Sequence, residues 1–155
     1  MPNQDWQNKA FNELTTNELY DILKLRVDIF VVEQTCYYPE LDNADRHIDT
    51  RHLYLYQANN IQAYLRILPK GLTYDDYVSI GRVAITEEAR GTGLGHQLIE
   101  QGIKICQQLY PKQAIKISAQ QHLENLYQQH GFVTVSEMYL EDNIPHISML
   151  RTAND

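Results

Sequence analysis

The sequence has few cysteines, and their spacing does not form a metal or redox pair. Only two of its 155 residues are cysteine, Cys36 and Cys106, and neither belongs to a Cys-x-x-Cys motif. Cys106 lies on the apolar stripe of an expected helix, so we interpret it as a buried free thiol. Unpaired thiols are typical of a reducing compartment.

Long apolar runs are also absent. No segment reaches the ~18 apolar residues that a membrane-spanning helix needs, and the N-terminus has no basic start followed by an apolar run. The six histidines show neither HxH nor HExxH spacing, so we expect no metal site. These absences predict a soluble, cytoplasmic protein that has no membrane partner.

Basic residues are outnumbered, because 13 Lys and Arg stand against 20 Asp and Glu, for a formal net charge of -7. A chain of this charge repels phosphate backbones as a whole, so nucleic acid is not an expected partner. A local basic or amide-rich site can still hold one small anion.

What is present is the pattern of one globular domain over residues 1–155, with 43% hydrophobic residues and neither repeats nor linkers. Alternating apolar residues predict strands over 6–14, 52–58, 61–68, 77–85, 114–119, 132–140 and 144–150. Helical spacing predicts helices over 16–33, 94–109 and 122–130, and the segment 35–51 has no period and is expected to be a long loop. This order indicates an α+β, three-layer fold: a mixed, mostly antiparallel central sheet of about seven strands with helices on both faces.

Local signals fix several element boundaries. Thr15 and Glu18 form a capping box at the start of the first helix. Asn59-Asn60 predicts a tight hairpin turn, Gly81 marks a bulge or splay point in its strand, and Gly131 predicts a left-handed helix cap.

The segment from Arg90 to Gly95 reads Arg-Gly-Thr-Gly-Leu-Gly, between an expected strand and an expected helix. Its three glycines let the backbone approach a ligand, and the first helical turn leaves N–H groups unpaired. Together with the charge of Arg90, this predicts a phosphate or pyrophosphate site.

Other glycine-rich phosphate sites do not match. A dinucleotide fingerprint needs a third glycine where His96 or Leu98 stands, and a P-loop needs Gly-Lys-Ser/Thr, which the chain lacks. A tight turn without any ligand remains an alternative at this point.

The glycine segment resembles the Q/R-x-x-G-x-G/A signature of the GNAT superfamily of N-acetyltransferases. Farther along, Asn125 to Phe132 resembles the second cofactor motif of that family, a short helix that runs into Gly-Phe. The ElaA-like subfamily is resembled by five segments: Leu25-Arg26, Phe30 to Gln34, Arg82-Val83, Gln120 to Leu123 and Glu141 to Ile147. The resemblance covers nearly the whole chain and implies a GNAT-like sheet with acetyl-CoA as the cofactor.

The resemblance also implies roles for individual residues. Backbone groups of Val83, Ala84 and Ile85 would pair with the pantetheine arm, and Asn125 would hydrogen-bond to it. Tyr127 would lie near the thioester sulfur and protonate the leaving thiolate. The pyrophosphate would be held by amides of the following residues: Arg90, Gly91, Thr92, Gly93, Leu94, Gly95 and His96.

Direct transfer from a thioester to an amine needs an acid for the thiolate and a base for the amine, but no protein nucleophile. Tyr127 can supply the acid, and a backbone amide near Val83 could polarise the carbonyl. The base is left open among six candidates: Glu33, Glu40, Asp42, Asp45, His52 and His146. We name Glu33 and His146 as catalytic candidates, although each has a structural alternative.

The acceptor is expected to be a small-molecule or peptide amine, drawn by the acidic loop. Its expected contacts are Arg26, Phe30, Glu33, Asp42 and His52. Arg26 has the alternative role of anchoring Glu33, Asp42 or Asp45. Two other functions stay open: an acyl-homoserine-lactone synthase, and a non-catalytic acyl-CoA sensor. Exposed hairpin edges are compatible with a homodimer.

Overall fold

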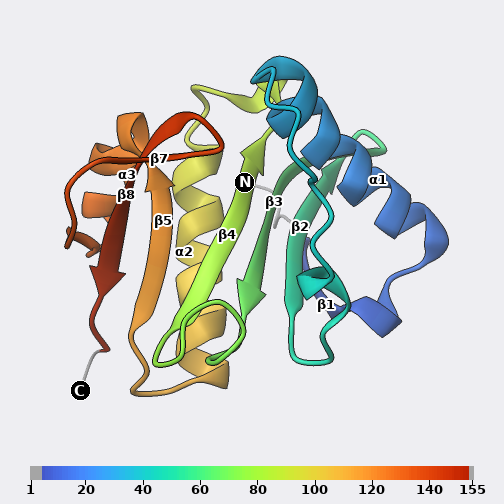
Figure 1. Ribbon diagram of the computed structural model, residues 1–155. Helices are drawn as coiled ribbons and strands as arrows, with labels where there is room; N and C mark the ends of the chain where they lie inside the picture. Colours follow the sequence, from blue (N-terminus) through green and yellow to red (C-terminus); the bar gives the residue numbers. More distant parts are fainter. Residues whose placement is uncertain (1–4, 154–155) are drawn as a thin grey trace.

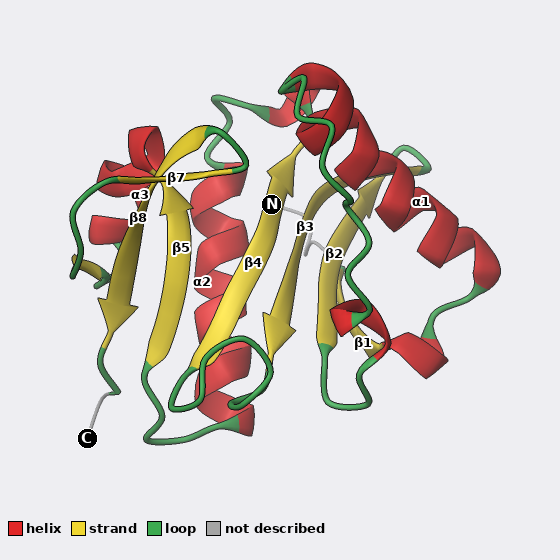
Figure 2. Cartoon of the chain, in the orientation of Figure 1, coloured by secondary structure: helices red, strands yellow, loops and turns green. Residues whose placement is uncertain are grey.

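The computed structural model describes residues 5–153, and its eight strands form one sheet (Figures 1 and 2). The strands are β1 (Trp6–Ala10), β2 (Arg51–Gln57), β3 (Asn60–Leu68), β4 (Val78–Ile85), β5 (Ile115–Gln120), β6 (Val133–Thr134), β7 (Tyr139–Glu141) and β8 (Ile144–Arg151). Their order is β1-β2-β3-β4-β5-β8-β6, and β7 also pairs with β8. Only the β4–β5 pair is parallel, so the mixed, mostly antiparallel sheet is confirmed.

Helices cover both faces of this sheet (Figure 1). They are α1 (Thr16–Arg26), α2 (Leu94–Leu109) and α3 (Glu124–Gln128), with short turns η1 (Phe11–Glu13), η3 (Ala44–Arg46), η4 (Glu87–Ala89) and η5 (Gln121–Leu123). Residues alternate along β2: Leu53 and Leu55 belong to the core that includes the buried residues of α2, whereas Tyr54 belongs to the core under α1. The period of two in the sequence therefore builds two separate cores.

The first helix differs from the expectation in its second half. The span 16–33 is helical as predicted, but α1 ends at Arg26 and continues as a wider π-helix, η2 (Val27–Glu33). The carbonyl of Ile29 accepts the N–H of Gln34, five residues on, at 3.1 Å. Apolar spacing does not distinguish a π-turn from an α-turn, and such turns are frequent at functional sites.

Three other boundaries needed correction. The first strand ends at Ala10 and turns into η1, four residues earlier than expected. The β2–β3 turn falls on Ala58 and Asn59, which both have positive φ, one residue before the predicted position. The predicted strand over 132–140 is split into β6 and β7. Between them the backbone N–H of Ser148 donates to the Ser136 hydroxyl oxygen instead of to a backbone carbonyl, which interrupts the ladder.

Two predicted conformational signals are confirmed. Gly131 has φ +90, as expected of a left-handed cap after α3. The capping box is present too: Thr15 Oγ1 accepts the N–H of Glu18 at 3.0 Å, and Glu18 Oε1 accepts the N–H of Thr15 at 2.9 Å. Glu18 also binds Lys9 Nζ at 3.0 Å and the hydroxyl of Tyr54, so the cap ties α1 to β1 and β2.

Replacing Thr15 with alanine is expected to lower the free energy of unfolding by about 1 kcal/mol, because the N–H of Glu18 loses its acceptor. Urea unfolding followed by circular dichroism measures the change. Thr16→Ala is the matched control: Thr16 is the exposed first residue of α1, and its side chain makes no hydrogen bond within residues 5–153, so a change within about 0.5 kcal/mol is expected. Equal losses in the two variants would contradict the role of the cap.

Candidate active site

A pocket of about 740 Å³ opens where the sheet separates between β4 and β5. These two strands pair only through Val78 with Ile115 and Ser79 with Lys116, and the ladder then stops. The edge of β4 beyond Ser79 therefore has no strand partner on the β5 side. Val83, Ala84 and Ile85 line the pocket along this edge.

A bulge accompanies the separation. Along β3 the register moves from Tyr64, opposite Ala84, to Arg66, opposite Gly81, so β4 holds one residue more than its partner there. The prediction of a bulge at Gly81 was correct within one residue, since the positive φ (+52) falls on Arg82. A non-glycine residue in this region is strained and persists only where its surroundings hold it.

The glycine turn follows the end of β4 and leads into α2. Gly91 and Gly93 have φ of +78 and +86, and an added Cβ on Gly91, Gly93 or Gly95 would meet no atom within 4 Å. Among the residues that the structure describes, no carbonyl or side chain accepts the N–H groups from Gly91 to His96. The turn thus offers a run of N–H donors without a partner in the described chain, next to a helix N-terminus.

The other groups of this turn are less uniform. The side chain of Leu94 is buried in the core, and Thr92 Oγ1 donates to the carbonyl of Ala89. His96 is exposed, and its Nδ1 lies 2.9 Å from Nε2 of His130. Of the segment 90–96, Arg90 and Gly95 line the pocket.

Glu33 and Arg90, which the sequence placed in different roles, lie together. Arg90 Nη2 and Glu33 Oε2 are 3.0 Å apart, and each side chain is about two-fifths exposed, at 42% and 43%. The pair joins the end of η2 to the glycine turn across the mouth of the pocket. The Glu33 carboxylate is therefore engaged in an ion pair with Arg90, and its role as a base stays a prediction.

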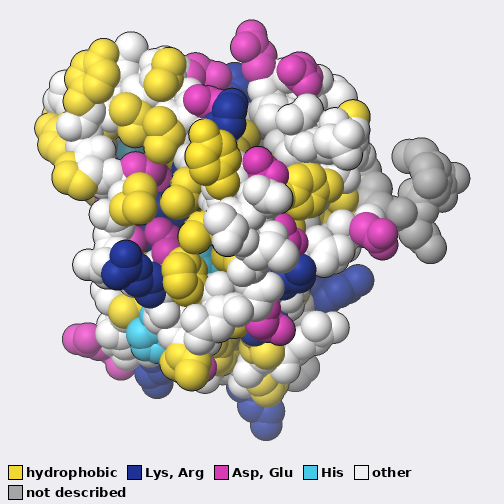
Figure 3. Space-filling model, turned by 90° about the vertical axis from the view of Figure 1, so that its right-hand side faces the viewer, with side chains coloured by type: hydrophobic (Ala, Val, Ile, Leu, Met, Phe, Trp, Pro, Cys, Tyr) yellow, Lys and Arg dark blue, Asp and Glu magenta, His cyan; other side chains and the backbone are white. Residues whose placement is uncertain are grey.

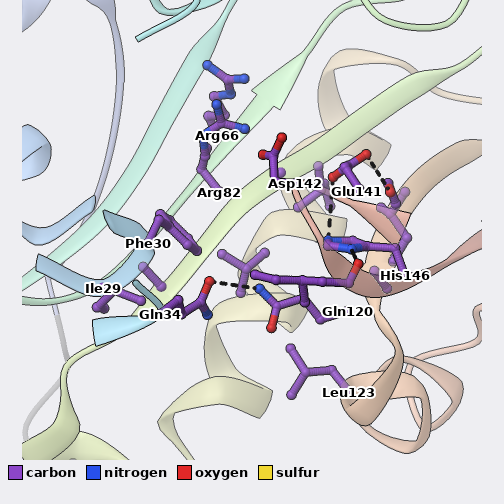
Figure 4. A pocket seen from close by; sticks show the side chains of 18 of the residues that line it. Ile29, Phe30, Gln34, Arg66, Arg82, Gln120, Leu123, Glu141, Asp142 and His146 are labelled. Carbon is purple, nitrogen blue, oxygen red and sulfur yellow. Dashed lines mark hydrogen bonds and ion pairs between the residues drawn. The ribbon is translucent and has the colours of Figure 1, made fainter. Parts of the chain in front are cut away.

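Three arginines and three carboxylates pin the long loop onto the sheet. Arg26 binds Glu40 and Asp45, both at 2.7 Å. Arg66 binds Asp42 at 2.6 Å and Asp45 at 3.0 Å. Arg82, the strained bulge residue, binds Glu40 at 2.8 Å. We call these six residues the arginine–carboxylate network; Arg66 and Arg82 are shown in Figure 4.

Two expected acceptor contacts are corrected by this network. Arg26 is fully buried and does not line the pocket, and its guanidinium anchors Asp45, the structural alternative, together with Glu40. His52 is 1% exposed, with ring nitrogens bonded to the Tyr64 hydroxyl and the carbonyl of Asp45. Burial lowers the pKa of His52. Both side chains are buried beneath the loop that borders the pocket, and neither of them lines the pocket.

Phe30, Glu33 and Asp42, the other three expected acceptor contacts, do line the pocket. Asp42 is held by Arg66, whose hydrogen bonds lower its pKa to about 2 in spite of partial burial. Asp45 is buried behind it. Burial alone would raise the pKa of Asp45, but hydrogen bonds from Arg26 and the charges of both arginines outweigh burial and lower it.

Tyr127 reaches the pocket from α3, and its ring packs edge-on against Phe132 at 5.7 Å. It is buried, and burial raises the pKa of its hydroxyl well above the usual value. Within the described part of the chain no group hydrogen-bonds to this hydroxyl. Asn125, two residues earlier, is exposed and does not line the pocket, so its contact with a cofactor arm stays a prediction.

At the other end of the pocket, His146 faces Glu141 (Figure 4). His146 lies on β8, is 7% exposed, and places Nε2 3.4 Å from Oε2 of Glu141. Glu141 Oε1 accepts the hydroxyl of Ser118 at 3.1 Å. The sequence named His146 but not Glu141 or Ser118. The hairpin around residues 141–143 was the available signal for Glu141, because it folds β7 back along β8.

A further contact missed from the sequence crosses the pocket. Gln120 Nε2, at the end of β5, lies 3.3 Å from Gln34 Oε1, just after η2 (Figure 4). On the face drawn in Figure 3, hydrophobic side chains gather at the upper left, and acidic and basic side chains lie interspersed beside them. Within residues 5–153 no cluster of metal-ligating side chains is found, and no helix is long and apolar enough to cross a bilayer.

The network predicts a loss of stability in acid. Asp42 and Asp45 have folded-state pKa values below those of an unfolded chain, so their contribution is present above about pH 4 and is lost as pH falls toward 2. We expect Asp42→Asn to be less stable at neutral pH and to show a flatter loss below about pH 5 in urea unfolding.

The control for this experiment is Asp28→Asn, which removes an exposed carboxylate paired with Lys24. Exposed pairs contribute little, so this variant should follow the wild-type pH curve. Parallel curves for wild type and Asp42→Asn would show that the network does not carry the acid sensitivity.

Comparison with known proteins agrees with this architecture. The model of the family described as an acetyltransferase (GNAT) domain matches residues 31–153. Protein ElaA of Escherichia coli is 40% identical over 147 residues, which cover 95% of each chain. Its crystal structure superposes with a TM-score of 0.90, at 39% identity, covering 96% of this chain and 99% of that one.

A second solved structure is similarly close. The acyl-CoA N-acyltransferase of Pseudomonas aeruginosa has a TM-score of 0.91 and 45% sequence identity, and covers 97% of this chain and 100% of its own. On the family match, the near-complete coverage and the shared fold, the chain belongs to the GNAT family of acyltransferases and is an ElaA-like enzyme of that family.

Proposed function

We propose that this enzyme transfers an acetyl group from acetyl-CoA to a primary amine by direct attack within a ternary complex. The observation that carries the proposal is the run of N–H groups from Gly91 to His96, which find no acceptor in the described chain. A pyrophosphate needs several donors at close range, and the open space at Gly91, Gly93 and Gly95 lets it approach the backbone.

The free edge of β4 supports the rest of the cofactor. A pantetheine arm carries amide groups, and the backbone of Val83, Ala84 and Ile85 has lost its β5 partner, so the arm can bind like an added strand. When bound there, acetyl-CoA supplies an activated acyl group. Arg90 is held by Glu33 and would add its charge at the phosphate end.

Tyr127 fits the role of the general acid. Its raised pKa keeps the hydroxyl protonated at neutral pH, and the hydroxyl is not committed to another described group. Its burial beside the pocket allows it to give a proton to the sulfur that leaves the acyl carbon. The proposal includes a small-molecule or peptide amine as acceptor and a cytoplasmic site of action.

The cofactor site is tested by two substitutions of one glycine. Gly95→Leu places a long side chain at the pocket wall without backbone strain, since Gly95 does not have positive φ. Gly95→Ala is the control, because the family signature accepts alanine there. Saturating acetyl-CoA at a hundredfold excess over its dissociation constant should stabilise wild type and Gly95→Ala by about 2.7 kcal/mol in thermal shift.

The leucine variant is expected to fold but to lose this stabilisation. If wild type responds to NAD or ATP and not to acetyl-CoA, the cofactor assignment is wrong. If acetyl-CoA stabilises Gly95→Leu as much as wild type, the pyrophosphate does not bind at the glycine turn.

The role of Tyr127 is tested by Tyr127→Phe, which keeps the packing against Phe132 and removes only the hydroxyl. We expect kcat to fall by roughly 10²- to 10⁴-fold while acetyl-CoA binding is retained. Thiol release is measured with polyamines, amino acids, aminoglycosides and short peptides as acceptors. Unchanged turnover in this variant would remove Tyr127 from the chemistry. Acetyl-CoA binding by wild type without turnover on any acceptor would favour a non-catalytic acyl-CoA sensor.

A further inference from the structure

The imidazole of His146 has one nitrogen whose state is fixed by its surroundings. Nδ1 lies 2.7 Å from the carbonyl oxygen of Ile144. A carbonyl oxygen can only accept, so Nδ1 must carry the proton and donate it. In the neutral ring, the lone pair is therefore on Nε2, the nitrogen directed toward Glu141 (Figure 4).

The Glu141 carboxylate is a second acceptor that faces Nε2 of His146. Its Oε2 is 3.4 Å from Nε2 of His146, and an ionised carboxylate has no proton to give. Its other oxygen is held by Ser118, which also contacts the hydroxyl of Tyr139. Two acceptors thus converge with no donor between them. A donor placed there, such as an N–H of a ligand, can hydrogen-bond to both acceptors.

The charge of this end of the pocket favours a cation. The carboxylates of Glu33, Glu40 and Asp42 are each paired with an arginine. Within residues 5–153, neither Glu141 nor its neighbour Asp142 pairs with a lysine or arginine. The unbalanced negative charge of the pocket therefore gathers at the β7–β8 hairpin.

We propose that Glu141 and His146 form the site for the ammonium group of the acceptor, a primary amine, and that His146 is its general base. This inference rests on the proposed transferase function and identifies, within it, the residues that bind the acceptor and the base. A primary ammonium has three N–H groups, so it can donate one to Glu141 Oε2 and another to His146 Nε2. A quaternary ammonium carries the same charge but can do neither.

The proton balance follows from this placement. Nε2 takes one proton from R–NH₃⁺, which leaves a neutral amine and an imidazolium stabilised by Glu141. The nitrogen lone pair then forms the C–N bond to the acyl carbon, and the C–S bond breaks with its electron pair on sulfur. Sulfur takes the Tyr127 proton, the tyrosinate regains one from the acylated nitrogen, and the imidazolium releases its proton to water.

Other titratable groups surround this end of the pocket and bear on its pH dependence. They are Glu141 and Tyr139 on β7, Asp142 in the turn and Tyr74 in the β3–β4 loop, while Ser118 and Gln120 of β5 are neutral. The Tyr139 ring stacks on His146. The side chains of Glu141 and Asp142 give this end of the pocket its negative charge.

A binding experiment tests the site without requiring turnover. The imidazole signals of the protein are followed by NMR at about pH 8, with His146→Gln used to assign its signal, while butylammonium or butyltrimethylammonium chloride is added. At this pH an alkylammonium is charged and an ordinary imidazole is neutral. We expect a saturable shift of the His146 signal with butylammonium and none with butyltrimethylammonium. No shift, or equal shifts with both salts, would overturn the inference.

Kinetics then separate a base from a merely structural histidine. With the best primary amine of the acceptor panel, kcat/KM of wild type should rise with pH through the titration of His146. In His146→Gln this rise of kcat/KM with pH, the limb of the pH profile, should disappear. Its kcat should fall by roughly 10²- to 10⁴-fold, with acetyl-CoA binding retained. Glu141→Gln should raise KM for the amine, because the ammonium loses its carboxylate partner.

The matched control is His122→Gln, the same substitution at an exposed histidine of the pocket wall, which should keep the wild-type limb. A His146→Gln variant with wild-type kcat and pH profile would reject the base while leaving the transferase proposal intact. If wild type acetylates no amine, the transferase proposal fails instead, and the butylammonium titration still decides whether this site binds primary amines.

Discussion

The pocket depends on the early end of pairing between β4 and β5. After two residue pairs the parallel ladder stops, and the β4 chain passes through a bulge in which Arg82 has φ +52. Such a conformation is unfavourable for a residue with a Cβ, so it needs support from outside the strand. The support is visible in the side chain of the same residue, whose guanidinium is fixed on Glu40 and its carbonyl oxygen.

That support extends through the arginine–carboxylate network to the whole loop between η2 and β2. Four of the six charged groups, Arg26, Arg66, Glu40 and Asp45, are largely removed from water, which is costly unless every charge has a partner. Asp45 is shared by Arg26 and Arg66, and Glu40 is shared by Arg26 and Arg82. Removing one side chain of the network therefore leaves the charges of its partners unpaired. A segment without helix or strand periodicity is thereby held as a fixed wall. The network also explains why carboxylates that look catalytic in the sequence are neutralised in the structure.

The sequence predicted the elements better than the site, and the reason is physical. Strand alternation and helical spacing report which face of an element is buried, and the capping box and Gly131 act over a few residues. Arg26 and His52 lie on element faces that are covered by the loop, whose position depends on ion pairs across 14 to 42 residues. No local pattern carries that information, so both were expected at the ligand. The π-turn of η2 was not predicted either, because its apolar residues keep nearly the spacing of an α-helix.

Two groups that can exchange protons, Tyr127 and His146, lie in different surroundings in one pocket. Tyr127 is buried among apolar groups, where the neutral form of a phenol is favoured, and it thus remains an acid. His146 is placed at the hairpin with its Nδ1 proton committed to a carbonyl and its Nε2 beside a carboxylate. Environments that separate two groups in this way are typical of acid and base pairs in enzymes. In the proposed reaction the amine loses its proton at the hairpin and the sulfur gains one at α3. In that proposal, the separation of β4 from β5 would admit the cofactor arm and also leave room for the acid at α3 and the base at the hairpin to act on one bound acyl group.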